Sequence, residues 1–189
     1  MRNFGVVFMF MLILFLVACG GKEIETNMSG KVADFEFTTQ DNERLSLNDL
    51  KGEWWIADFI FTKCTTVCLP MSSNLASLQL KLKEEDISAQ LVSFTVDPDF
   101  DTPEVLKEYA EAYGADLSNW SFLTGYDFET IQEISENTFK TVLEEGVVGQ
   151  RAHGIYFYLI DPDGNIVKKY DGMSEAELDL LVNDFKTVL

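Results

Sequence analysis

From residue 33 onwards, the sequence predicts an α/β fold in which helices flank a mixed sheet. Short apolar runs alternate along the chain with longer segments whose apolar residues recur at helical spacing. One of these runs, residues 54–61, is almost entirely apolar, which is typical of a central strand that is covered on both faces. The chain then closes with two adjacent strand-like runs and a last helical segment. This order of elements favours a mixed sheet with helices on both of its faces.

The first elements predict a hairpin at the edge of the sheet. Residues 35–38 and 44–47 each alternate apolar and polar side chains, and the turn-forming residues 40–42 separate the two runs. Residues 48–52 contain Asn, Asp and Gly, so they predict a turn before the central strand at 54–61.

A helix and a second strand are predicted after the central strand. The helix is expected to end near the charged residues 83–85. Its apolar stripe consists of Met71, Leu75, Leu78, Leu80 and Leu82. Residues 90–96 predict the next strand of the sheet.

The next helix has a distinct start signal. Residues 101–104 combine a capping residue, a proline near the first helical position and an acidic residue in the first turn. We expect this helix to run to about Tyr113 and to stop at Gly114. Residues 120–123 predict a short strand, and residues 127–139 predict a further helix.

The last part of the chain predicts a hairpin followed by a helix. The six apolar residues 155–160 are typical of a buried strand, and the tight turn at 161–164 leads back into a strand at 165–170. Ser174 and Glu177 have the spacing of a capping box, which predicts the start of the last helix.

Residues 1–32 are predicted to lie outside this domain. The apolar run at 4–17 has the length of a signal-peptide core and is short for a membrane-spanning helix. It ends at Cys19 in a pattern that resembles the bacterial lipoprotein signal, in which the cysteine receives lipid. We therefore expect a signal peptide over 1–18, a lipidated Cys19 with a flexible tether over 19–32, and one domain over 33–189. A plain signal peptide and an uncleaved anchor helix are the alternatives.

The charge balance limits the partners of this domain. The chain has 32 acidic and 14 basic residues, a net charge of −18, which becomes −19 when Arg2 is removed with the signal peptide. Such a surface repels nucleic acid and anionic lipid headgroups, so we expect no nucleic-acid partner. The charge fits either solubility alone or attraction of cations or of a basic partner. A lipid anchor would hold the acidic domain at a membrane that it would otherwise avoid.

Cys64 and Cys68 lie where the central strand ends and a helix begins. A spacing of four residues places them on one face of a helical turn, about 6 Å apart at their Cα atoms. This distance suits a disulfide and also suits two sulfur ligands of one metal ion. The helix start favours the thiolate form. A structural disulfide is poorly placed here, because it would contribute roughly 2 kcal/mol between groups that the helix already holds together.

His153 is the single histidine of the chain, and it lies in a glycine-flanked loop before the buried strand at 155–160. A lone histidine can be an ordinary surface residue. In a sheet of this order, however, this loop can face the helix start that carries the two cysteines. Two sulfurs and one imidazole nitrogen would form a three-ligand site for a soft metal such as copper or zinc. A four-ligand structural zinc site lacks a further Cys or His beside these three once Cys19 is lipidated.

With these residues in place, the chain resembles the Sco/SenC family over nearly all of residues 33–189. The resemblance is carried by residues 61–70 (FTKCTTVCLP), 93–103 (SFTVDPDFDTP) and 120–125 (WSFLTG), and by His153 before an apolar strand. One departure is Leu69, which stands where the family often has a proline directly after the second cysteine. A second feature is the absence of proline between 146 and 161, where a thioredoxin reductant carries its cis-proline. His153 occupies that neighbourhood, which favours metal binding over general disulfide exchange.

The resemblance implies a thioredoxin-like fold and a copper site. It implies that Cys64, Cys68 and His153 bind copper, as Cu(I) or Cu(II), and that the protein assists assembly of the copper A centre of cytochrome c oxidase. The implied partners are the oxidase subunit that carries this centre, a copper donor protein and a thiol reductant. The expected location is the bacterial cell membrane, with the anchored domain on the extracytoplasmic face.

Three other residues have two interpretations each. Asp97 and Asp101 flank a turn after a strand, and helix capping and turn formation explain them. The resemblance places this acidic pair near the copper site and implies a role in partner docking or metal transfer. Met71 lies one helical turn after Cys68 and could be a soft ligand, but its position favours packing in the core.

Two alternatives to a copper chaperone stay open at this stage. A thiol–disulfide reductase that keeps the copper-ligand cysteines of the oxidase reduced would use the redox pair Cys64 and Cys68, and would not need His153. A peroxidase related to the thioredoxin-like peroxiredoxins would place a reactive cysteine near the same helix start.

Overall fold

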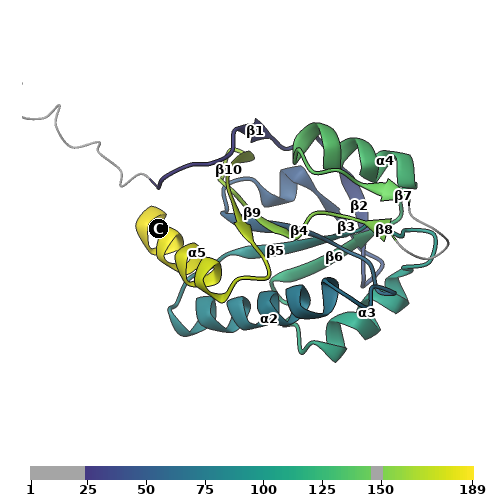
Figure 1. The fold of residues 1–189 in the computed structure, drawn as a ribbon, viewed down its shortest axis with the longest axis horizontal. Helices are drawn as coiled ribbons and strands as arrows, with labels where there is room; N and C mark the ends of the chain where they lie inside the picture. The colour runs from purple at the N-terminus through teal and green to yellow at the C-terminus, as the bar shows by residue number, and fades with distance from the viewer. Residues whose placement is uncertain (1–23, 146–150) are drawn as a thin grey trace, which may run out of the picture.

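A computed structural model describes residues 24–145 and 151–189 (Figure 1). The strands are β1 (Gly30–Lys31), β2 (Glu36–Thr39), β3 (Arg44–Ser46), β4 (Trp55–Ile60), β5 (Gln90–Thr95), β6 (Trp120–Thr124), β7 (Glu144–Glu145), β8 (Arg151–Ala152), β9 (Tyr156–Ile160) and β10 (Asn165–Asp171). The α-helices are α2 (Cys68–Glu84), α3 (Pro103–Ala112), α4 (Phe128–Glu133) and α5 (Glu175–Val188). A 3₁₀ turn, η2 (Leu47–Leu50), follows β3, and a π-helical turn, η3 (Ile134–Thr138), extends α4.

Eight of the described strands form one mixed sheet, in the order β1-β10-β9-β4-β5-β6-β2-β3. Strands β4, β5 and β6 are parallel, whereas β9 pairs with β4 and β10 pairs with β9 in the antiparallel direction. The N-terminal hairpin of β2 and β3 forms one edge of the sheet, next to β6. The predicted α/β fold with an edge hairpin is therefore confirmed.

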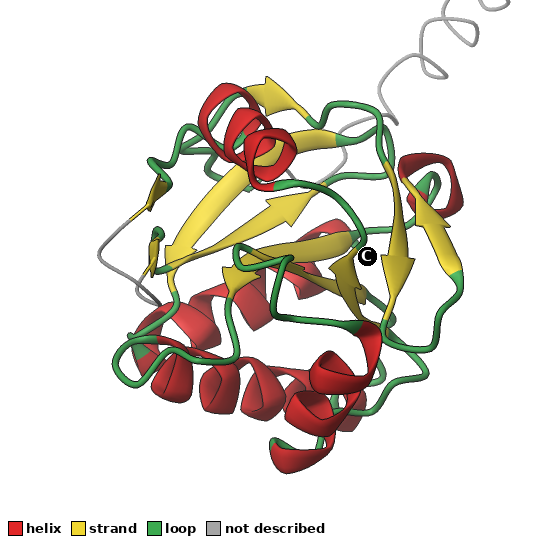
Figure 2. Ribbon diagram, turned by 90° about the vertical axis from the view of Figure 1, so that its right-hand side faces the viewer, coloured by secondary structure: helices red, strands yellow, loops and turns green. Residues whose placement is uncertain are grey.

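Both faces of the sheet are covered, because the side chains of β4 alternate between two cores. Trp55, Ala57 and Phe59 face a core closed by η2, α4 and η3. Ile56 and Ile60 face a second core closed by α2, α3 and α5. Figure 2 shows the resulting layers, with helices on either side of the sheet. This double burial explains why residues 54–61 are almost continuously apolar.

The helix after the central strand is longer than its apolar stripe predicted. α2 begins at Cys68, so the second cysteine is its first residue. Met71, Leu75, Leu78 and Leu82 are buried against the sheet, as expected. The inclusion of Leu80 in this stripe was wrong, since its side chain is 61 % exposed. The reason is geometric, because a residue two positions from Leu78 points to the other side of the helix.

The helix caps were predicted with mixed success. Thr102 caps α3, its side chain accepts a hydrogen bond from the Val105 N–H, and Pro103 is the first helical residue, as the sequence predicted. Ser174 precedes α5, but its side chain makes no capping hydrogen bond, so the predicted capping box was wrong. A capping box occurs instead at Ser46 and Asp49, where it turns the chain from β3 into η2.

The sheet begins before residue 33. Gly30 and Lys31, within the segment that we expect to be a tether, form β1 and pair with β10. The signal peptide over 1–18 and the lipidated Cys19 lie outside the described residues. Within 24–145 and 151–189, no helix combines the length and the apolar character that a membrane span requires.

Candidate metal centre

The topology of the sheet brings three separate segments to the same end of neighbouring strands. β4 and β5 run parallel, so the residues that follow them lie at the same end of the sheet. β9 runs antiparallel to β4, with Ala57 opposite Tyr158, so the residues that precede β9 lie at that end too. The loop with Cys64, the first residue of α2 and the loop with His153 therefore converge, although 85 residues separate Cys68 from His153.

The three candidate ligands lie close enough to share one metal ion. The Sγ atom of Cys68 lies 3.0 Å from Nε2 of His153. The Sγ atoms of Cys64 and Cys68 and a ring nitrogen of His153 all lie within 4.8 Å of one another. Both cysteines are buried and His153 is half-buried. No disulfide joins Cys64 and Cys68, and metal binding needs this reduced form of the pair.

The orientation of His153 leaves the correct nitrogen available. Its Nδ1 lies 2.9 Å from the carbonyl oxygen of Gly154. Because a carbonyl can only accept, Nδ1 carries a proton, and the second ring nitrogen, Nε2, faces Cys68 and is the atom that could bind a metal. The ring also packs edge-on against Phe61, with centroids 5.7 Å apart. A backbone carbonyl on the second nitrogen is the usual way in which proteins orient a metal-binding histidine.

The two thiols are chemically different. Burial alone would raise the pKa of Cys64, but hydrogen bonds from His153, from Cys68 and from the backbone of Thr66 outweigh it and lower this pKa to about 6. The backbone N–H of Cys68, 3.4 Å from the Cys64 sulfur, belongs to this set. Burial raises the pKa of Cys68, and its hydrogen bond to the Cys64 sulfur raises it further. At neutral pH the site therefore holds one thiolate and one thiol.

Asp101 lies near the site but is completely buried. Its carboxylate accepts hydrogen bonds from the backbone N–H of Thr62, 3.1 Å away, from the Thr62 hydroxyl and from the Thr95 hydroxyl. Burial raises the pKa of Asp101, while these hydrogen bonds act in the opposite direction. Asp101 thus ties the loop that carries Cys64 to the end of β5. Sequence reasoning missed this anchoring contact, because nothing in the spacing indicates it.

Asp97 has a smaller structural role. Its backbone N–H donates to the Thr95 hydroxyl, and its carbonyl accepts from the N–H groups of Phe100 and Asp101. These bonds form the turn before α3, in agreement with the turn-forming interpretation. The side chain of Asp97 is 7 % exposed, so it reaches the surface more than Asp101 does.

A buried carboxyl group under α2 was also missed. Asp58 on β4 accepts a hydrogen bond from the Ser93 hydroxyl at 2.5 Å, and this hydroxyl accepts one from the indole N–H of Trp120. The second oxygen of Asp58, Oδ2, has no hydrogen-bond partner. Complete burial raises the pKa of Asp58 to about 7. The available signal was a lone acidic residue in the apolar run 54–61.

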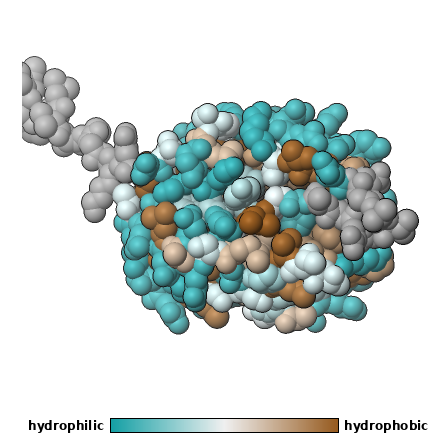
Figure 3. Space-filling model, in the orientation of Figure 1, coloured by the Kyte–Doolittle hydropathy of each residue, from teal (hydrophilic) through white to brown (hydrophobic). Residues whose placement is uncertain are grey.

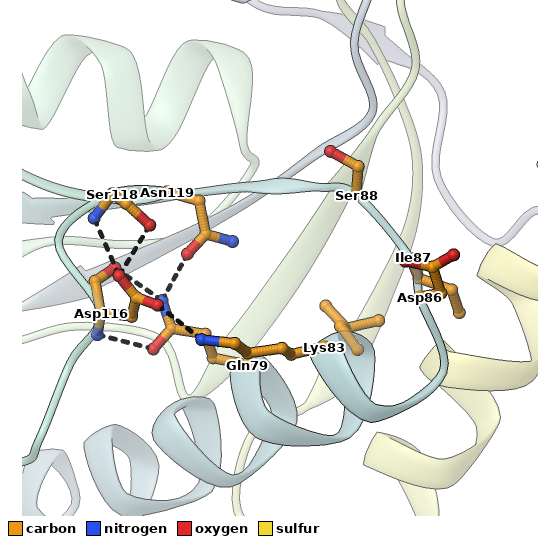
Figure 4. Close-up of a pocket in the computed structure, with 9 residues that line it drawn as sticks. Gln79, Lys83, Asp86, Ile87, Ser88, Asp116, Ser118 and Asn119 are labelled. Atoms are coloured by element: carbon orange, nitrogen blue, oxygen red, sulfur yellow. Dashed lines mark hydrogen bonds and ion pairs between the residues drawn. The ribbon is translucent and has the colours of Figure 1, made fainter.

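Two other features can be assigned to structure. Met71 is fully buried and packs in the core between α2 and the sheet, as its position favoured. A cavity at the far end of α2 is drawn in Figure 4. The Gln79 side chain bonds there to Asn119 and to the backbone of Asp116, and Lys83 pairs with the Asp116 carboxylate. These polar groups bond to one another, so the cavity carries no reactive group.

Comparison with known proteins identifies a family. The SCO1/SenC family model matches residues 24–188. A SCO1/SenC family lipoprotein from Bacillus anthracis str. Ames is 42 % identical, with a TM-score of 0.83 over 86 % of this chain and 98 % of its own. BsSco, a member of the Sco family of cytochrome c oxidase assembly proteins in which a disulfide switch was identified, is 41 % identical. Its TM-score is 0.81 over 87 % of this chain and 96 % of its own.

A more distant relative has been solved with the metal. Arabidopsis thaliana ScoI with copper bound is 26 % identical to this chain, with a TM-score of 0.71 over 82 % of this chain and 97 % of its own. The family model spans almost the whole described structure, including both cysteines and the histidine. On this evidence, the chain belongs to the SCO1/SenC family.

Proposed function

We propose that this protein binds one copper ion through Cys64, Cys68 and His153 and delivers it to the copper A site of cytochrome c oxidase. The observation that carries the proposal is the convergence of two sulfurs and one nitrogen within 4.8 Å. Two soft thiolates and one imidazole form a donor set that suits copper. The copper-bound relative from Arabidopsis thaliana supports the choice of metal.

The protonation states of the site define how copper enters. Cys64 is already a thiolate at neutral pH and Nε2 of His153 faces the site, whereas Cys68 still holds its proton. Binding therefore releases the Cys68 proton at neutral pH, and affinity rises with pH. Release to the acceptor proceeds by exchange of ligands, as acceptor sulfurs replace those of Cys64 and Cys68.

Copper titration of the reduced protein tests the proposal. We expect one copper ion per chain and, with Cu(II), a sulfur-to-metal charge-transfer band. His153→Ala should weaken binding by more than about 100-fold, the upper range for loss of a group that only supports a ligand. Met71→Leu is the matched control, since it removes a nearby sulfur that we place in the core, and it should bind normally. Unchanged affinity in His153→Ala would exclude the three-ligand site.

One observation supports a second candidate function. The pKa of about 6 makes Cys64 a thiolate that can attack a disulfide in the oxidase subunit. Attack would form a mixed disulfide, and Cys68 would then displace the target, leaving two target thiols and a Cys64–Cys68 disulfide. A thiol reductant must return this disulfide to two thiols. Rescue of oxidase assembly by His153→Ala would favour the reductase, and failure would favour the chaperone.

We also propose that Cys19 is lipidated after cleavage of residues 1–18, and that the segment between Cys19 and the folded domain tethers that domain to the outer face of the cell membrane. The lipoprotein relative from Bacillus anthracis supports this location. Incorporation of a labelled fatty acid, lost in Cys19→Ala, is the expected result.

A further inference from the structure

The exposed apolar side chains of the described residues are unevenly distributed. Seven large hydrophobic side chains are exposed there. On the one face that Figure 3 shows, hydrophilic residues predominate and hydrophobic ones are scattered among them. Four of the seven lie on segments that border the candidate metal centre, and we call them the apolar collar. The apolar collar consists of Leu69, Phe100, Val142 and Met173. Their exposed fractions run from 40 % for Met173 to 63 % for Val142.

Two members of the collar lie beside the cysteines. Leu69 directly follows Cys68 in the first turn of α2. The ammonium nitrogen of Lys63 lies 3.3 Å from the centroid of the Phe100 ring. Lys63 directly precedes Cys64 in the chain. These two members of the collar therefore lie next to the residues that carry the two sulfurs.

The other two members border the histidine side. A Cβ atom on Gly154 would lie only 2.2 Å from Thr141 Oγ1, so Thr141, which directly precedes Val142, lies against the residue after His153. Gly172 donates its N–H to Ile155, and its carbonyl accepts from Asn74 of α2, which places Met173 between α2 and the start of β9. The segments that carry the collar therefore adjoin the segments that carry all three candidate ligands.

Acidic residues accompany the collar. Asp99 precedes Phe100, Glu144 lies two residues after Val142, and Asp171 accepts a hydrogen bond from the backbone of Met173. Asp99 and Glu144 are exposed. Although the Lys63 ammonium lies over Phe100, the net charge of −18 makes the protein as a whole strongly acidic. A partner that fits such a surface has an apolar centre and a rim of lysine or arginine side chains.

We propose that the apolar collar is the docking surface for the domain that accepts the copper, and that this domain presents apolar side chains within a basic rim. This inference rests on the proposed function. Both cysteines are buried and His153 is half-buried, so acceptor sulfurs can reach the metal only when the two surfaces touch. Apolar contact around the ligands also excludes water from the exchange, and the net negative charge of the protein steers a basic partner to it.

Transfer kinetics to a purified, copper-free copper A domain of a cytochrome c oxidase subunit test this surface. The collar variant combines Val142→Ala with Met173→Ala, and the control combines Leu80→Ala with Leu180→Ala. The pairs are matched, because Leu80 is 61 % and Leu180 is 39 % exposed, and both lie on the outer sides of α2 and α5. We expect normal copper titration in both variants, transfer slowed at least tenfold in the collar variant alone, and wild-type transfer that slows with added salt.

Several results would overturn the docking surface. Wild-type transfer rates in the collar variant would do so, as would equal slowing in the control. Collar-dependent self-association in sedimentation would show that a second copy covers the surface, and collar-dependent binding to phosphatidylcholine vesicles would show that a membrane does. Should the collar variant lose copper, Phe100→Ala is measured in its place.

A failure of the proposed function can be distinguished from a failure of the docking surface. It would appear as absence of copper binding in the wild-type protein. In that case, calorimetry of the reduced, copper-free protein with the same acceptor domain still decides the docking surface, with loss of binding confined to the collar variant as the expected result.

Discussion

At the scale of single residues, the main property of the site is the difference between its two sulfurs. Cys64 receives hydrogen bonds from its neighbours, and these favour its charged form. Cys68 is more deeply enclosed, and ionising it would place a second negative charge beside the first. The fold therefore makes Cys64 a nucleophilic thiolate at neutral pH and keeps Cys68 protonated.

This difference predicts the pH dependence of alkylation in the reduced, copper-free protein. The reaction of Cys64 with iodoacetamide should reach half of its plateau rate near pH 6, because only the thiolate reacts. Cys68 should stay almost unreactive up to pH 9, because its pKa is raised. Mass spectrometry of the digested protein at each pH measures both rates. In His153→Ala the midpoint for Cys64 should move to higher pH, because a hydrogen bond that lowers its pKa is removed.

The unfolded chain provides the control for this experiment. In urea both cysteines should react with one midpoint near the ordinary thiol pKa of about 8.5. A midpoint near 8.5 for Cys64 in the folded protein would contradict the assignment of a stable thiolate.

Residue types and spacing indicated Cys64 and Cys68 as a candidate pair, because only a few side-chain types bind soft metals, whereas His153 joined them only through the assumed strand order and the family resemblance. Residue types and spacing were insufficient for Asp101 and Asp58. The contacts of Asp101 join residues 39 positions apart, and the partner of Asp58 is 35 positions away. Such pairings depend on strand register, which a local pattern does not contain.

At the scale of elements, the loop between β8 and β9 determines the position of the imidazole. The carbonyl oxygen of Gly154 accepts a hydrogen bond from Nδ1 of His153. Gly154 also lies against Thr141. A methyl group at this position would be 2.2 Å from Thr141 Oγ1, which is less than any van der Waals contact allows. Thr141 is β-branched, so it cannot easily rotate away.

Gly154→Ala should therefore displace His153 and weaken copper binding by about 10- to 100-fold, the usual effect of disturbing a group that orients a ligand. Competition with a copper-binding dye measures the affinity, and circular dichroism should show an unchanged fold. Adding Thr141→Ala to Gly154→Ala removes the clashing oxygen and should restore most of the affinity, while Thr141→Ala alone should bind normally. Full affinity in the single Gly154→Ala variant would show that the loop does not position the ligand.

The order of the elements was predictable because strands and helices of this domain have clear periods and end signals. Gly114 ends α3 with a positive φ of 67°, and the Asp161–Gly164 turn separates β9 from β10, both as expected. The π-helical turn after α4 was not predictable, because its residues continue an ordinary helical pattern. Its residue Ser135 exchanges hydrogen bonds with the backbone of Thr141, the residue that lies against Gly154.

At the scale of the whole molecule, the site joins distant parts of the sequence. Cys64 and Cys68 follow β4, and His153 precedes β9, so a copper ion would link two neighbouring strands of the sheet at one end. The position of this site could be predicted once the strand order was assumed. The order itself could not, because local patterns do not show which strands are neighbours.

Copper should raise the melting temperature of the reduced protein, because its three ligands come together only in the folded chain. With free Cu(I) at 1,000 times its dissociation constant, the gain is at most about 4.1 kcal/mol, or roughly 8–16 °C for a domain of this size. The gain should be smaller in His153→Ala, because the unfolded chain keeps both cysteines four residues apart and can bind copper there, whereas only folding adds the histidine. Calorimetric scans with and without buffered Cu(I) measure the four melting temperatures. Equal gains in the two proteins would mean that folding contributes nothing to the site beyond the cysteine pair.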